Sequence, residues 1–153
     1  MNNTTESILN ELVETSNDGE KGFMKAAADT KNAELKAVFA EGARRCREGM
    51  QELQVLVRAQ GGDPEKSGSI AAAIHRGWVT VREAVTSRDD EAILEECERG
   101  EDYAKAQYRK ALERELPSTV REIVDRQYRG VVANHDRVRT LRDRYRASAE
   151  VRP

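Results

Sequence analysis

The sequence predicts an all-α protein, built as a single domain from four long helices and one short one. Three observations favour this class. Apolar residues recur at steps of three and four over long stretches, the chain has only 3 Pro, and 35 % of its residues are charged. A chain of 153 residues can bury one hydrophobic core. We expect one domain over residues 1–153, with a helical core over about 5–146 and a frayed tail.

The first helix is expected from about Thr5 to Thr30, where a threonine at position 4 or 5 can cap its amide groups. The second helix follows a short break at Lys31 and Asn32 and ends before the stop signal Gly61-Gly62-Asp63-Pro64. Its inward stripe contains Gly42 and Gly49. Glycine is unfavourable inside a helix, so we expect close helix approach there, or room for a bulky neighbouring side chain.

A short amphipathic helix is predicted over Ile70 to Val85, with the lone Trp78 as its anchor. The third long helix is expected from about Asp89 to Glu115, and the fourth begins near Pro117 and runs to about Arg146. Tight connections make the first and second helices antiparallel, and likewise the third and fourth. The short helix is long enough to carry the chain most of the way along the bundle, which predicts an up-down-down-up four-helix bundle with a short crossover helix.

Two carboxylates lie in the inward stripes, Glu20 in the first helix and Glu101 in the third. Helix lengths place them within about one turn of the same level. Buried carboxylates are costly unless a cation, a metal or a shared proton compensates them. In one interpretation Arg44, Arg45 or Arg129 pairs with them, and Gln127 and Asn134 complete a buried polar layer.

The alternative interpretation is a metal site. Its candidate ligands are Glu20, Glu101, His135 and Gln127, with iron or manganese as the candidate ions. A full di-iron site would need two Glu-x-x-His motifs, and the chain contains none. We therefore expect no cofactor and no catalytic residues. A metal site with only these four candidate ligands is the alternative.

Charge and hydropathy narrow the partners and the location. The net charge of −2 mixes both signs along the chain, and no stretch approaches the ~20 apolar residues of a bilayer span, so we expect neither nucleic acid nor membrane as a partner. The first residues resemble no secretion signal, which predicts a cytoplasmic protein. Cys46 and Cys97 are expected as reduced thiols. Apolar residues outside the main stripes, Val55, Val57 and Val79, predict a homodimer.

Several segments in order, among them NDGEKGF, EGARRCREGM, GGDPEKSGS, HRGW and EECERGEDYA, resemble a bacterial domain-of-unknown-function family of ferritin-like four-helix-bundle proteins. The resemblance covers about Leu9 to Asp143. It implies a ferritin-like fold, an association with stress responses and no established activity. Glu20 and Glu101 match the lone glutamates of the wider superfamily. The functional expectation is therefore a non-enzymatic bundle, with a metal-binding or oxidoreductase protein and a helical adaptor for a protein partner as alternatives.

Overall fold

The computed structural model describes residues 3–64 and 87–151, and within these ranges it contains helices and short connections but no strand. The predicted all-α class is confirmed for this part of the chain. The four described helices are α1 (Asn3–Asp29), α2 (Ala33–Ala59), α4 (Ser87–Leu112) and α5 (Ser118–Val151). They agree with the four long helices expected from the sequence, except that α5 extends past the expected end at Arg146. The predicted crossover helix, Ile70 to Val85, lies outside the described residues.

Both ends of α2 follow from local sequence. The Asn32 side chain caps the helix by accepting a hydrogen bond of 3.0 Å from the backbone N–H of Leu35. At the other end Gly61 has a φ of 81°, a left-handed conformation that glycine adopts at little cost. The Gly62 N–H then donates to the Val57 carbonyl at 3.0 Å. The glycine pair therefore ends the helix where the sequence predicts.

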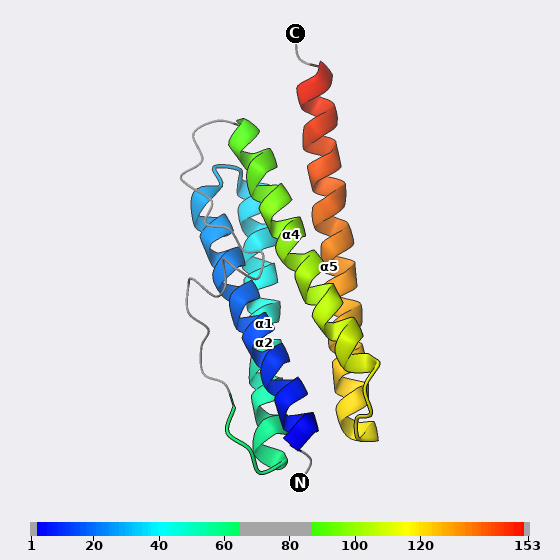
Figure 1. The fold of residues 1–153 in the computed structure, drawn as a ribbon. Helices are drawn as coiled ribbons and strands as arrows, with labels where there is room; N and C mark the ends of the chain where they lie inside the picture. The colour runs from blue at the N-terminus through cyan, green and yellow to red at the C-terminus, as the bar shows by residue number, and fades with distance from the viewer. Residues whose placement is uncertain (1–2, 65–86, 152–153) are drawn as a thin grey trace.

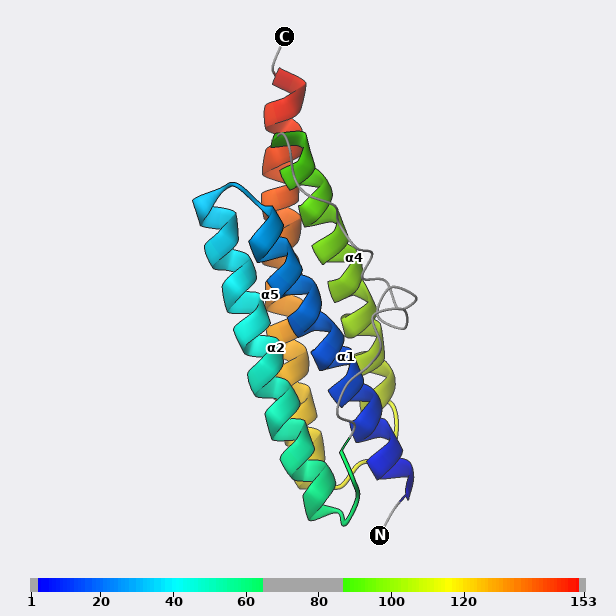
Figure 2. The ribbon, with the colours of Figure 1, turned by 90° about the vertical axis from the view of Figure 1, so that its left-hand side faces the viewer.

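The helices form an elongated bundle in which α1 packs against α2 and α4, and α4 packs against α5 (Figures 1 and 2). Helices α1 and α5 run in one direction along the bundle, and α2 and α4 run in the other (Figure 1). The pair α2 and α5 makes the sparsest contact of the packed pairs. The last turns of α5 extend past the neighbouring end of α4 in both views. The bundle therefore has a loosely packed seam between α2 and α5.

The buried apolar residues form two clusters, one toward each end of the bundle. The first contains Phe23 and Phe39, whose ring centroids lie 6.4 Å apart. A Cβ atom at Gly42 would approach the Phe23 ring to 3.1 Å, so the missing side chain makes room for this ring, as the sequence predicts. The second cluster includes Leu12 and Leu53. Between the two clusters lies a layer of polar residues.

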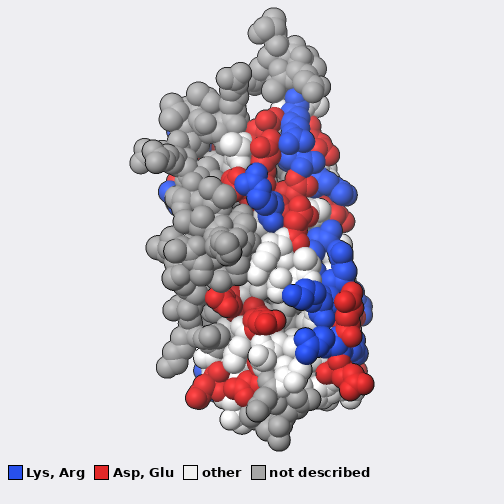
Figure 3. Space-filling view, in the orientation of Figure 1, with Lys and Arg blue, Asp and Glu red and all other residues white. Residues whose placement is uncertain are grey.

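The surface carries both charge signs. In the view of Figure 3, Lys and Arg side chains lie beside Asp and Glu side chains along the right-hand side of the molecule. One part of the predicted apolar patch is wrong: Val57 is fully buried in the core, because its position on α2 faces inward, whereas Val55 is 60 % exposed. Val79 lies outside the described residues. No helix in ranges 3–64 and 87–151 combines the length and hydrophobicity that a membrane span requires.

Candidate ligand-binding cavity

A cavity of about 390 Å³ occupies the polar layer in the middle of the bundle. All four described helices contribute to its wall. Its mouth lies at the seam between α2 and α5, where the lining side chains Glu48, Glu52 and Arg126 are exposed or partly exposed. Gly49 of α2 and Gly130 of α5 also line it, and because neither has a side chain, the space stays open.

The inner wall contains an ion pair between two helices. Arg45 of α2 donates from Nη2 to Oε1 of Glu101 on α4 at 2.8 Å. The Glu101 carboxylate is buried and also accepts a hydrogen bond from the Asn134 amide of α5. Burial raises the pKa of Glu101, and the nearby Arg45 guanidinium offsets part of this increase. Keeping the Glu101 carboxylate ionised therefore costs desolvation free energy.

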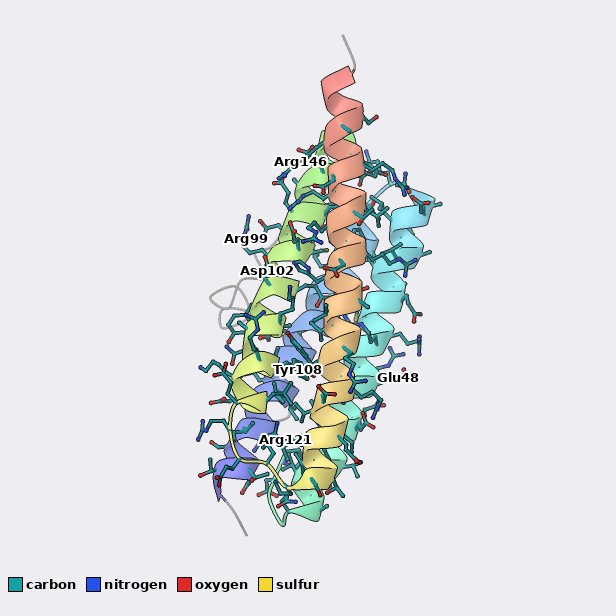
Figure 4. The ribbon with its side chains drawn as sticks, turned by 90° about the vertical axis from the view of Figure 1, so that its right-hand side faces the viewer. Glu48, Arg99, Asp102, Tyr108, Arg121 and Arg146 are labelled. Atoms are coloured by element: carbon teal, nitrogen blue, oxygen red, sulfur yellow. The ribbon has the colours of Figure 1, made fainter. Side chains whose placement is uncertain are left out.

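A second polar group lies beside this pair. The Tyr108 hydroxyl donates to Oε1 of Gln127 at 2.8 Å and lies 3.3 Å from the Ser16 hydroxyl. Gln127 donates in turn to the Gly49 carbonyl at 3.2 Å and to Glu52 at 2.7 Å. Figure 4 shows Tyr108 of α4 and Glu48 of α2 on either side of α5. Gln127 therefore links α4 to α2 across the seam.

The cavity wall offers no activated nucleophile among its cysteine and tyrosine side chains. Burial raises the pKa of the Cys46 thiol to about 12, although Arg45 lies close to it. Burial also raises the pKa of the Tyr108 hydroxyl above its usual value. Both groups therefore stay protonated at neutral pH. Cys46 and Cys97 are free thiols, as the sequence predicts.

The four candidate metal ligands have separate partners. Glu20 is partly buried and lies 3.7 Å from the Arg47 guanidinium, whereas Glu101 pairs with Arg45. His135 is buried, with Nε2 2.6 Å from a carboxylate oxygen of Asp102. In the described part of the chain, no group of three or more His, Cys, Asp or Glu side chains is arranged to hold a metal ion. The metal site remains a prediction.

The arginine interpretation is confirmed for one of its three candidates. Arg45 pairs with Glu101, and Asn134 completes that interaction. Arg44 instead pairs within its own helix with Glu41 and Glu48, and Arg129 pairs with Asp125. The expected common level of Glu20 and Glu101 stays a prediction, and the two have different arginine partners, Arg47 and Arg45. The reason is that Arg45 points inward from α2 and Arg47 toward the edge.

Sequence reasoning missed the cavity itself and the three charged residues at its mouth. Gly49 and Gly130, on helices that face each other across the seam, are the available signal. A Cβ atom at Gly49 would lie 3.6 Å from Gln127, and one at Gly130 would lie 3.8 Å from Cδ of Arg45. Glycines at one level of two facing helices indicate missing volume between them.

Residues 4–114 match the protein family described as "Domain of unknown function (DUF2383)". The chain belongs to this family. The prediction of a domain-of-unknown-function family is thereby confirmed. No curated protein matches the chain. The matched range includes Ser16, Arg45, Glu101 and Tyr108 of the cavity, whereas α5, which supplies Gln127 and Asn134, begins after it.

Proposed function

We propose that this protein is a non-enzymatic, ferritin-like helical bundle that binds a small polar organic molecule in the cavity between α2 and α5. The observation that carries the proposal is the cavity itself, about 390 Å³ in volume, with polar side chains from all four described helices converging on it. Ligand sites in helical bundles are built in this way, from side chains on facing helices. The helix directions in Figure 1 support the ferritin-like arrangement.

Two features support binding rather than catalysis. The Cys46 thiol and the Tyr108 hydroxyl both have raised pKa values, so neither is poised to act as a nucleophile or base at neutral pH. His135 contributes nothing to the cavity wall. Glu101 accepts hydrogen bonds from Arg45 and Asn134 on one oxygen, which fixes the orientation of this carboxylate in the cavity wall. The stress association implied by the family resemblance, self-association and an adaptor role remain predictions.

The proposal is tested by NMR titration with 1,6-hexanediol, an uncharged probe with a polar group at each end. We expect saturable shifts of the Gly49 and Gly130 amide signals, which report on the cavity wall. A leucine at position 49 projects into the cavity, so Gly49→Leu should abolish the shifts. Gly49→Ala is the matched control, because its Cβ makes only ordinary contact with Gln127. Shifts that do not saturate, or that persist in Gly49→Leu, would contradict the proposal.

A further inference from the structure

The inner end of the cavity offers hydrogen-bond donors that the protein does not use. Only Nη2 of Arg45 has partners in the described part of the chain, namely Glu101 and the Cys46 sulfur at 3.9 Å. The Nε–H group of Arg45 has no partner there but almost no accessible surface, so a ligand would reach the rest of the guanidinium, on a side chain that keeps 27 % of its surface exposed. A guanidinium has five donors in a fixed plane, and most of them are left without an acceptor among the described residues. This end of the cavity therefore favours a ligand group that accepts hydrogen bonds.

The mouth has the opposite character. Glu48 and Glu52 lie one turn apart on α2 and both line the cavity, and Arg126 of the wall pairs with Glu52. The charged residues of the wall are three carboxylates and two guanidinium groups, so the wall carries one excess negative charge. Arg44, which pairs with Glu48, is shared with Glu41 and lies outside the wall. This end favours a cationic ligand group.

The spacing of these ends sets the length of the ligand. Glu48 and Glu52 lie three and seven residues from Arg45 on one helix, which at about 1.5 Å per residue places a point between them about 7–8 Å from Arg45 along the seam. An extended six-carbon chain with a polar group at each end is of comparable length. The cavity volume of about 390 Å³ accommodates a molecule of this size.

We infer that the cavity binds a small amino-carboxylate zwitterion, with its carboxylate on Arg45 and its ammonium between Glu48 and Glu52. The inference rests on the proposed function and adds the chemical class and the orientation of the ligand. The charge-assisted hydrogen bonds at both ends distinguish this class from a neutral molecule of equal length.

Four probes with the same six-carbon chain test the inference: 6-aminohexanoate, hexanoate, hexylammonium and 1,6-hexanediol. Isothermal titration calorimetry compares their affinities for the full chain. We expect 6-aminohexanoate to bind at least about tenfold more tightly than the diol, because it gains a charge-assisted contact at each end. Hexanoate and hexylammonium should each have intermediate affinity.

Variants assign each contact to its residue. Glu48→Gln should weaken binding of 6-aminohexanoate and hexylammonium but leave hexanoate unchanged. Glu41→Gln is the matched control, because Glu41 also pairs with Arg44 but lies outside the cavity wall. The double variant Arg45→Met with Glu101→Gln removes both charges of the buried pair, which keeps the fold, and should weaken binding of 6-aminohexanoate and hexanoate alone. Arg47→Met is its control outside the wall.

The outcomes separate this inference from the proposed function. If the diol binds as tightly as 6-aminohexanoate, the zwitterion class is wrong and the cavity still binds small polar molecules. If 6-aminohexanoate binds Glu48→Gln and the double variant as tightly as it binds the original protein, the orientation is wrong. If none of the four probes binds, both the inference and the proposed function fail.

Discussion

Arg45 of α2 donates to Glu101 of α4 at 2.8 Å, and this contact joins two helices at the wall of the central cavity. The carboxylate is buried, whereas the Arg45 side chain keeps 27 % of its surface exposed. Glu101 has lost its hydration, while Arg45 retains part of its own. Loss of the partner should therefore cost more free energy for Glu101 than for Arg45.

Replacing Arg45 alone should be more damaging than replacing both partners. We expect Arg45→Met to lower the free energy of unfolding by about 3 kcal/mol at neutral pH, because it leaves Glu101 buried without its cation. Adding Glu101→Gln should recover most of that loss, since a neutral amide can still bond to Asn134. Urea denaturation of the single and double variants measures both values. Equal stability of the two variants would show that the Glu101 carboxylate carries no cost when its cation is removed.

The raised pKa of Glu101 predicts a specific pH dependence. A carboxyl group whose folded-state pKa lies above its ordinary value of 4.5 binds more protons in the folded state. Its stabilising contribution is full below pH 4.5 and is lost as the pH rises through the folded-state pKa. Glu101→Gln lacks this loss. The difference in free energy of unfolding between the two proteins should therefore shift in favour of the variant as the pH rises from 4.5. Denaturation midpoints of both proteins across this window test the sign. A stability difference independent of pH would contradict it.

Replacing Gly19 and Gly49 by alanine should change the stability of the protein in opposite directions. A Cβ atom at Gly19 would lie 2.7 Å from the Cys46 sulfur, whereas one at Gly49 would lie 3.6 Å from Gln127. Gly49→Ala should stabilise the protein by about 0.5–1 kcal/mol, since alanine has the higher helix propensity. Gly19→Ala should destabilise it by about 1–3 kcal/mol through overpacking. Adding Cys46→Ala, which removes the clashing sulfur, should rescue Gly19→Ala in thermal melts. Failure of this rescue would place the strain elsewhere.

The Tyr108 hydroxyl should contribute to stability through its two contacts. Tyr108→Phe removes the donor to Gln127 and the contact with Ser16 while preserving the ring. We expect a loss of about 1–2 kcal/mol, because the Gln127 carbonyl oxygen then lacks its donor. Tyr128→Phe is the control, because the Tyr128 side chain packs at the edge of the apolar cluster and does not line the cavity. Equal losses in the two variants would indicate a general effect of removing a hydroxyl group.

The metal hypothesis has its own measurement. Elemental analysis of protein purified without a chelating tag should find no stoichiometric iron or manganese, because arginines pair with both Glu20 and Glu101. Adding iron should leave the thermal melting temperature unchanged. Stoichiometric metal that disappears in Glu20→Ala would instead support the site of Glu20, Glu101, His135 and Gln127.

Hydrophobic periodicity and local capping residues were sufficient to predict the helices. The apolar steps of three and four predict all four described helices, because a 3.6-residue repeat is a property of the chain alone. Asn32 and Gly61 end elements through their own hydrogen-bonding and backbone preferences, and they do so where the sequence predicts. The inward position of Glu101 follows from the same repeat. The fold class and the buried carboxylate therefore follow from the order of residues within each helix.

The pairing of charged groups depends on how the helices pack together. Arg44, Arg45 and Arg47 differ by only a few positions on one helix, yet they pair with Glu41 and Glu48, with Glu101 and with Glu20 respectively. A long flexible side chain reaches about a turn in either direction, so helical spacing does not select its partner. The cavity likewise depends on how far apart α2 and α5 pack, a distance set by the side chains of all four described helices together. No periodicity within a single helix encodes that distance.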